Sequence, residues 1–297
     1  MKIKIFLCLT YVFRIRKMRD IKNFYYTFIF SITMIKKIHY CWFGSEKPDI
    51  VKRNVEQWAQ LNPDFEICEW NEYNINISKY EFGRRALEQR KWGFLVDTIR
   101  PQKLVEQGGF YIDADVELIS PLSTLSDTPN LLQMGYMYNC ALGTAILYAP
   151  PAHPYLQDIL HSYNYIKPDL WPVSNTIFTA YFINRVKDFI LNGKEWQNDY
   201  CRIFSKETFE QPSFIRSHGI SIHHCCGSWK KEFNNQFGFS GSTSFISHLL
   251  KWASRKRRTY LATRVNEFSP CYKAALKGKH INFDISGIYT TSTPYTT

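Results

Sequence analysis

The sequence lacks several features that would place it in a class at once. None of its eight cysteines forms a Cys-x-x-Cys pair, which weighs against a zinc ribbon. No apolar run reaches the roughly 18–20 residues that span a bilayer, since residues 5–13 and 24–35 form runs of only nine and twelve. Neither run precedes a small-residue cleavage site. We therefore interpret the cysteines as reduced, mostly buried thiols of a cytoplasmic protein.

The body of the chain also lacks an excess of positive charge, although the net charge is +11. Residues 1–37 contribute +8 and residues 251–264 contribute +6, which leaves residues 38–250 at −4. A mildly acidic body weighs against a duplex-binding face, so we expect no nucleic-acid partner. The basic ends favour contact with an anionic membrane surface, on the inner face of the cytoplasmic membrane, or form a solvated tail.

Apolar residues and a regular alternation of elements are what the chain does contain. Its 297 residues are 45% hydrophobic and 16% aromatic, enough for a large core in one or two domains. Hydrophobic patterns predict strands and helices in turn, at residues 37–43, 48–59, 65–70, 80–107, 141–148, 173–190, 215–223 and 245–262. This order predicts an α/β fold with an open sheet that binds ligands at the carboxyl ends of its strands.

The most informative stretch is Gly108–Leu118, with the sequence GGFYIDADVEL. On a strand, Asp113 and Asp115 would point to the same face, roughly 6.5–7 Å apart. Two like charges on one face repel unless a cation lies between them. Carboxylates of this kind suit Mg²⁺ or Mn²⁺, which take further ligands from substrate phosphates. Chance occurrence on a solvated loop is the alternative, but the neighbouring residues are apolar, where carboxylates are costly.

Upstream, Asp97 and Arg100 are spaced to share one face of a predicted helix. They would form a surface ion pair of little consequence. Alternatively both face the site, where the aspartate binds sugar or ribose hydroxyls and the arginine neutralises phosphate or holds the sugar. Pro101 follows directly and either kinks the helix at Asp97 or opens a new one.

These motifs together resemble glycosyltransferase family 32, whose relatives include the yeast Golgi initiating mannosyltransferase and, more distantly, the glucosylating bacterial toxins. Four blocks occur in family order, namely Ile38–Gly44, Asn62–Glu66 with Trp70–Glu72, Asp97–Leu118 and His223–Trp229. The resemblance implies a GT-A-like, Rossmann-type open mixed sheet flanked by helices. It also implies a nucleotide-sugar donor, a divalent metal and retention of anomeric configuration.

The resemblance further assigns roles to individual residues. Trp42 would stack on the nucleotide base. Asp115 would ligate the metal directly, whereas Asp113 would contact both the metal and the donor sugar. Asp97 and Arg100 would hold ribose and donor sugar.

The last block resembles the carboxyl-terminal His-x-x-Gly-x-x-Lys motif of family 8 galactosyltransferases. It implies His224 as a metal ligand and Lys230 as a phosphate-binding residue, while Ser228 and Trp229 would close over the diphosphate. Adjacent residues of a strand face opposite ways, so only one histidine can face the metal, and His223 is the alternative ligand.

The resemblance also predicts the domain organisation. Family members begin shortly before the first strand, so we interpret residues 1–33 as an extension upstream of the true start at Met34. An amphipathic membrane anchor is the alternative. Residues 34–240 would form the catalytic domain, residues 241–264 a basic amphipathic helix and residues 265–297 a poorly ordered tail.

We therefore expect a metal-dependent retaining glycosyltransferase that uses Mn²⁺ or Mg²⁺, with Asp113 and Asp115 as its catalytic residues. It would move a hexose, from a UDP-sugar by preference, to a saccharide or lipid-linked saccharide in surface polysaccharide synthesis. The alternatives are an effector that glycosylates a protein, a non-catalytic sugar-binding protein, and a hydrolase. Two aspartates on one strand face lack the placement across the scissile bond that glycosidases use.

Overall fold

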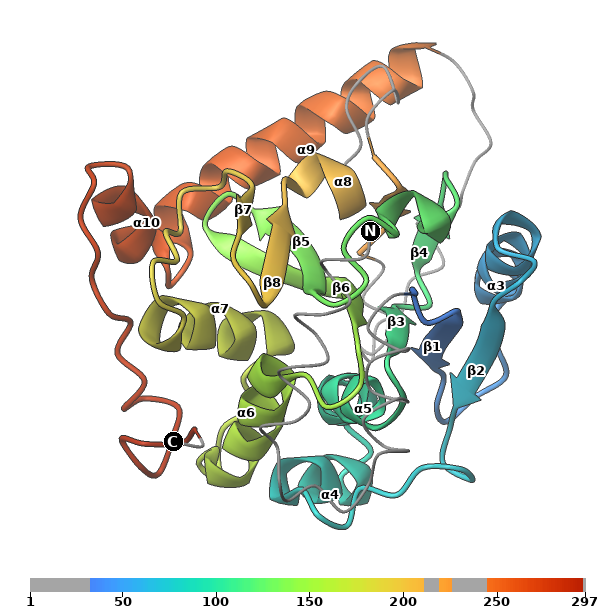
Figure 1. Cartoon of the computed structure of the whole chain (residues 1–297), viewed down its shortest axis with the longest axis horizontal. Helices are drawn as coiled ribbons and strands as arrows, with labels where there is room; N and C mark the ends of the chain where they lie inside the picture. The colour runs from blue at the N-terminus through green and yellow to red at the C-terminus, as the bar shows by residue number, and fades with distance from the viewer. Residues whose placement is uncertain (1–32, 211–218, 226–244, 296–297) are drawn as a thin grey trace, which may run out of the picture. The chain divides into compact units, whose positions relative to one another are not determined.

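The structure is a computed structural model that describes residues 33–210, 219–225 and 245–295. Contacts divide the chain into two units, residues 1–33 and 34–297, and the fold described here is that of the second unit (Figure 1).

A seven-stranded mixed sheet forms the centre of this unit, in the order β2-β1-β3-β6-β5-β8-β7. Its strands are β1 (Lys37–Cys41), β2 (Glu66–Trp70), β3 (Gly109–Ile112), β5 (Leu132–Tyr138), β6 (Ala141–Ala149), β7 (Trp196–Gln197) and β8 (Cys201–Phe204). Strands β2, β1 and β3 are parallel, and β6 runs antiparallel to both β3 and β5. A separate antiparallel pair joins β4 (Val116–Leu118) to β9 (Ser221–His223).

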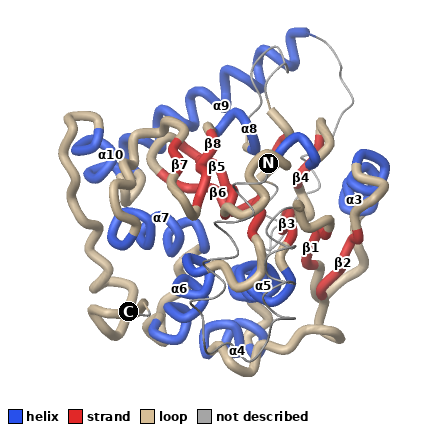
Figure 2. The backbone as a smooth tube through the Cα atoms, viewed as in Figure 1, coloured by secondary structure: helices blue, strands red, loops and turns tan. Residues whose placement is uncertain are grey.

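Helices flank the sheet, as Figures 1 and 2 show. They are α3 (Asp49–Leu61), α4 (Glu81–Glu88), α5 (Trp92–Gln107), α6 (Pro154–Ser162), α7 (Ser174–Arg185), α8 (Lys206–Phe209), α9 (Phe245–Val265) and α10 (Ser269–Ala275), with short 3-10 turns at Leu122–Leu125 and Tyr163–Tyr165. One core cluster includes apolar side chains of α4–α7, and a second includes those of α3 and α8. The predicted fold class, an α/β open mixed sheet flanked by helices, is confirmed.

A glycine pair controls the passage from α5 into β3. Helix α5 continues through Pro101, which is buried, so Pro101 does not open a new helix. Gly108 follows the helix with a φ of 66°, and Gly109 has a φ of 102°. A Cβ atom at Gly109 would lie 2.8 Å from the carbonyl oxygen of Lys37. Only glycine tolerates both this backbone and this approach, so β3 can start directly beside β1.

Two predicted segments differ from the structure. The helix expected at residues 173–190 ends at Arg185. Residues 265–295 are packed rather than a poorly ordered tail, because they contain α10 and the buried side chains of Phe268, Tyr289 and Tyr295. Residues 215–218 of the predicted strand 215–223 lie outside the described residues. Within the described part of the chain, no helix is long and apolar enough to cross a membrane.

Candidate active site

The two aspartates of the DXD motif lie in a turn, not on a strand. Strand β3 ends at Ile112, and β4 begins at Val116, whose backbone N–H donates to the carbonyl oxygen of Asp113 at 3.0 Å. The prediction that strand alternation aligns Asp113 and Asp115 was therefore wrong. The turn nevertheless brings both carboxylates to the carboxyl end of β3, where an open sheet binds ligands.

His223 joins these aspartates through the pairing of β4 with β9. Val116 lies opposite His223 in this pair. Asp113, Asp115 and His223 each offer one ligand atom, and these atoms all lie within 4.8 Å of one another. The three side chains are half-buried. Two carboxylates and an imidazole, partly open to substrate, form a donor set that fits a divalent cation.

His224, the preferred metal ligand of the sequence prediction, lies elsewhere. Its Nε2 atom is 3.1 Å from a carboxylate oxygen of Glu117. Among the described residues, the structure groups His223 and not His224 with Asp113 and Asp115. The alternative ligand of the prediction is thus the one that the geometry favours.

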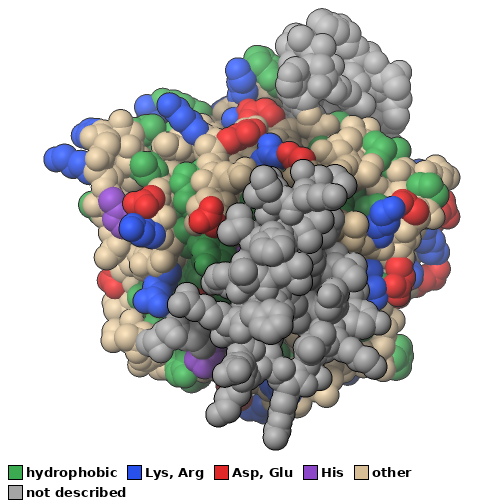
Figure 3. Space-filling view, viewed as in Figure 1, with side chains coloured by type: hydrophobic (Ala, Val, Ile, Leu, Met, Phe, Trp, Pro, Cys, Tyr) green, Lys and Arg blue, Asp and Glu red, His purple; other side chains and the backbone are tan. Residues whose placement is uncertain are grey.

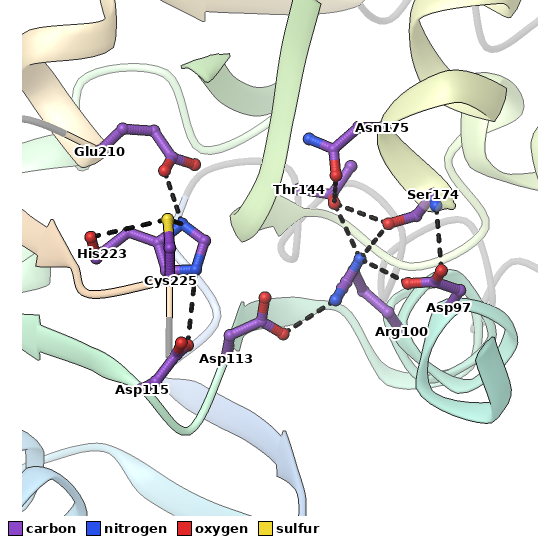
Figure 4. A network of polar contacts seen from close by, with 10 residues as sticks. All are labelled: Asp97, Arg100, Asp113, Asp115, Thr144, Ser174, Asn175, Glu210, His223 and Cys225. Carbon is purple, nitrogen blue, oxygen red and sulfur yellow. Dashed lines mark hydrogen bonds and ion pairs between the residues drawn. The ribbon is translucent and has the colours of Figure 1, made fainter. Parts of the chain in front are cut away.

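Arg100 holds the other side of Asp113 (Figure 4). Its Nη2 donates to Asp113 Oδ1 at 2.8 Å, and its Nη1 lies 3.2 Å from Asp97 Oδ1. Nη1 also donates to the hydroxyls of Thr144 at 2.8 Å and Ser174 at 2.6 Å. Asp97 Oδ2 in turn accepts the backbone N–H of Ser174, at the first turn of α7. The side chains of Arg100 and Asp97 are 4% and 10% exposed, so a surface ion pair is excluded.

Burial changes the protonation of this cluster. It raises the pKa of Asp97 to about 6 and raises that of Asp113, in both cases against the charge of Arg100. For His223, burial lowers the pKa, but the carboxylates of Glu210 and Asp115 outweigh this and hold the pKa well above its usual value. Charged groups this close together, at one end of a sheet, are typical of functional sites.

These residues line a cavity of about 650 Å³. Its wall includes Trp42, Asp97, Arg100, Asp113, Asp115 and His223. A volume of this size is typical of a small-molecule site. Trp42 follows β1, and its indole N–H donates to the carbonyl oxygen of Ser45 at 2.8 Å. Every described residue that the sequence analysis proposed for the site, except His224, thus lines this cavity.

Ser228, Trp229 and Lys230 lie outside the described residues. Sequence reasoning missed Thr144, Ser174 and Glu210, which contact Arg100 or His223. Each is a single polar residue far in sequence from its partner. Only the tertiary fold reveals such residues.

A known family model covers part of this site. Residues 48–132 match the family model described as "Glycosyltransferase sugar-binding region containing DXD motif". That segment contains Asp97, Arg100, Asp113 and Asp115. The chain is therefore glycosyltransferase-like with a DXD sugar-binding region, and the expectation of a glycosyltransferase enzyme is confirmed. No curated protein matches the chain.

Two solved structures are similar at low identity. One, titled "PaToxG Glycosyltransferase", has 15% identity and a TM-score of 0.45 over 56% of this chain and 76% of that chain. The other is a glycosyltransferase "involved in the glycosylation of the major capsid of PBCV-1". It has 12% identity and a TM-score of 0.41 over 73% of this chain and 98% of that chain.

Proposed function

We propose that the protein is a metal-dependent retaining glycosyltransferase of the family 32 type, which moves a hexose from a nucleotide-sugar to a saccharide or lipid-linked saccharide acceptor. The observation that carries this proposal is the convergence of Asp113, Asp115 and His223 in a cavity of about 650 Å³ that also contains Trp42. A UDP-sugar is the favoured donor, and surface polysaccharide synthesis is the favoured role.

Asp113, Asp115 and His223 would hold the divalent cation, with Mn²⁺ favoured over Mg²⁺. When bound there, the cation supplies Lewis-acid stabilisation of the charge that develops on the leaving nucleotide diphosphate. Arg100 fixes Asp113 Oδ1 at 2.8 Å and leaves the second oxygen of that carboxylate for the cation or the donor sugar.

The remaining residues position the substrates. Trp42 would stack on the base, and Asp97 with Arg100 would orient the ribose and donor sugar from the wall of the cavity. Ser228 and Trp229 are proposed to close over the diphosphate, and Lys230 is proposed to bind a phosphate. Retention requires the acceptor hydroxyl to attack from the face that the diphosphate leaves. The departing phosphate would take the hydroxyl proton, so we assign no separate general base.

A donor panel tests this proposal directly. The full chain is incubated with UDP- and GDP-sugars and Mn²⁺, without acceptor, and nucleotide release is measured. We expect slow hydrolysis of one donor, its loss in excess EDTA and its recovery with Mn²⁺. Release that persists in EDTA, or release with no donor of the panel, would contradict the proposal.

We further propose that α9 contacts an anionic membrane surface, as the charge distribution predicts. Lys256, Arg257 and Arg264 are exposed on this helix beside exposed Leu261. Figure 3 shows basic side chains along the edge where α9 runs. Arg258 is left out of the test, because it lines a small pocket with Glu210 and His223.

Co-sedimentation with vesicles containing anionic lipid tests this contact. Replacing Lys256, Arg257 and Arg264 by glutamine should weaken sedimentation, and added salt should weaken that of the wild type in the same way. Nucleotide release should not change. Equal sedimentation of variant and wild type would make the cluster a solvated surface.

A further inference from the structure

His223 lies between two carboxylates that approach opposite nitrogens of its ring (Figure 4). Its Nε2 atom is 3.5 Å from Asp115 Oδ1, on the side of the DXD turn. Its Nδ1 atom is 2.5 Å from Glu210 Oε2, on the opposite side. The two carboxylates therefore contact different ring atoms.

Glu210 is held firmly behind the ring. It follows α8, and its side chain is only 4% exposed. Its backbone carbonyl also accepts the N–H of His223 at 3.3 Å, which ties β9 to this segment. A Cβ atom at Gly143 of β6 would lie 2.7 Å from Glu210 Oε1. Strand β6 thus leaves room for this carboxylate by having no side chain at position 143.

A buried carboxylate at Nδ1 decides what Nε2 can do. In a neutral imidazole one ring nitrogen carries the proton and the other carries the lone pair. A carboxylate accepts a hydrogen bond but cannot donate one when ionised, so Glu210 places the proton on Nδ1. In the neutral ring that a bound cation requires, the lone pair then lies on Nε2, on the side of Asp115 and Asp113. Histidines that bind metals in proteins commonly donate their second N–H to a carboxylate in this way.

We propose that Glu210 is a positioning residue, which fixes the ring orientation and tautomer of His223 so that Nε2 completes the cation site with Asp113 and Asp115. This rests on the proposed function, because that function requires the cation. Nothing in the sequence pattern assigned Glu210 a role. The expected consequence of losing it is weaker metal binding rather than loss of a group that touches substrate.

The chain contains a matched control one residue away. His224, directly after β9, and Glu117 of β4 form another histidine–carboxylate pair, with Nε2 and Oε2 3.1 Å apart. His224 does not belong to the groups of potential metal ligands among the described residues. A carboxylate-to-amide change at Glu117 therefore alters the same chemistry at the neighbouring histidine.

The test measures Mn²⁺ affinity without donor, by electron paramagnetic resonance of free Mn²⁺ during titration of the full chain. Glu210→Ala should weaken binding by about 10- to 100-fold. Glu210→Gln should weaken it less, because the amide oxygen can still accept the Nδ1 proton. Glu117→Gln should bind within about threefold of wild type. Circular dichroism establishes that each variant is folded. If Glu210→Ala does not fold, Glu210→Gln still provides the test, because it conserves the volume of the side chain.

Three outcomes would overturn the proposal. Folded Glu210 variants that bind Mn²⁺ as tightly as wild type would show that Glu210 has only a structural role. A Glu117→Gln variant that binds Mn²⁺ as weakly as Glu210→Gln would show that the loss of affinity is not specific to the carboxylate beside His223.

The third concerns Cys225, whose Sγ is 3.6 Å from the same Nδ1 and which forms a second possible ligand group with Glu210 and His223. Loss of Mn²⁺ binding in Cys225→Ser would place the cation on the Nδ1 side. Wild-type protein that binds no Mn²⁺ at all would instead contradict the proposed function, so the two failures are distinguishable.

Discussion

The two walls of the cavity differ in how their charges are balanced. On the α5 wall, defined by Asp97, Arg100, Thr144 and Ser174, a buried arginine contacts every other member of the group. On the β9 wall, defined by Asp115, Glu210, His223 and Cys225, a single histidine lies between two carboxylates. Asp113 lies between the walls and belongs to the network of Arg100.

This difference separates two tasks. The α5 wall is largely closed to water and supplies its own counter-charge, so it acts as a scaffold that fixes Asp113. The β9 wall has an excess of negative charge beside the open cavity, and a divalent cation would balance that excess. Changes on the α5 wall should therefore reduce stability first, whereas changes on the β9 wall should reduce activity first.

The largest expected effect is on the β9 wall. Asp115→Asn preserves the size of the side chain but removes a charge that holds the cation. Turnover in the nucleotide-release assay should fall by at least about 10³-fold, roughly 4 kcal/mol of transition-state stabilisation.

The melting temperature of Asp115→Asn should stay close to that of wild type, because the change relieves repulsion with Asp113. Asp127→Asn is the control, since Asp127 is an exposed partner of Arg202 and should leave turnover unchanged. An Asp115→Asn variant within tenfold of wild type would contradict the assignment of this wall.

The second effect is on the α5 wall. Arg100→Met leaves Asp97 and Asp113 without their counter-charge, and the loss of one partner of a buried pair costs about 4 kcal/mol. The free energy of unfolding, from chemical denaturation, should fall by that amount.

Arg202→Met serves as the comparison for Arg100→Met, because Arg202 pairs with Asp127 at 2.7 Å on a more exposed surface. It should cost less than about 1 kcal/mol. Similar costs for the two arginines would mean that burial adds nothing on the α5 wall.

The local sequence pattern predicted the site residues of one segment better than those that distant segments bring to them. Asp97, Arg100, Asp113 and Asp115 all lie within 19 consecutive residues, where spacing and apolar neighbours carry information. The β9 wall depends on which residue of this segment pairs with β4. A shift of one residue in the pairing would exchange His223 for His224. That register comes from pairing between distant segments, which no local pattern specifies.

Other differences have similar physical origins. Asp113 and Asp115 converge through a turn because β3 ends at Ile112, although the residues around them read as one strand. Helix α5 contains Pro101 because tertiary packing compensates for the lost hydrogen bond. Residues 265–295 are polar on average, and yet isolated aromatic side chains such as Tyr289 and Tyr295 join the main core cluster. Isolated apolar residues have no period that predicts burial.

A third prediction concerns the pH dependence of the α5 wall. Burial raises the pKa of Asp97 from 3.8 to about 6, so the folded protein holds this proton more tightly than the unfolded chain. The resulting stability is complete below the unfolded pKa and is lost as pH rises through about 6.

Asp97→Asn removes this titration. The unfolding free energy of wild type minus that of Asp97→Asn should therefore fall by up to about 3 kcal/mol between about pH 4 and pH 7. Denaturation curves of both proteins across this range provide the measurement. A difference that does not vary with pH would show that folding does not raise the pKa of Asp97.

The smallest effect comes from a single hydroxyl on the α5 wall. Thr144 is 2% exposed, and its Oγ1 accepts a hydrogen bond from Arg100 at 2.8 Å. Thr144→Val preserves the shape and removes that acceptor, while Ser174 and Asp97 remain beside the same nitrogen. The change also removes the contacts of this hydroxyl with Ser174 Oγ at 2.8 Å and Asn175 Oδ1 at 3.4 Å. The loss of the hydroxyl should lower the unfolding free energy by about 1–2 kcal/mol.

Thr98→Val on α5 is the matched control for this hydroxyl. Thr98 is fully buried, and its Oγ1 has no hydrogen-bond partner among the described residues. Replacing an unsatisfied buried hydroxyl by a methyl group should be neutral or slightly stabilising. The two variants change the same atoms at the same depth, so their difference measures the hydrogen bonds of the Thr144 hydroxyl, of which the one to Arg100 involves a charged group. If Thr98→Val costs as much as Thr144→Val, the cost reflects packing, and the hydroxyl contributes nothing to holding Arg100 in place.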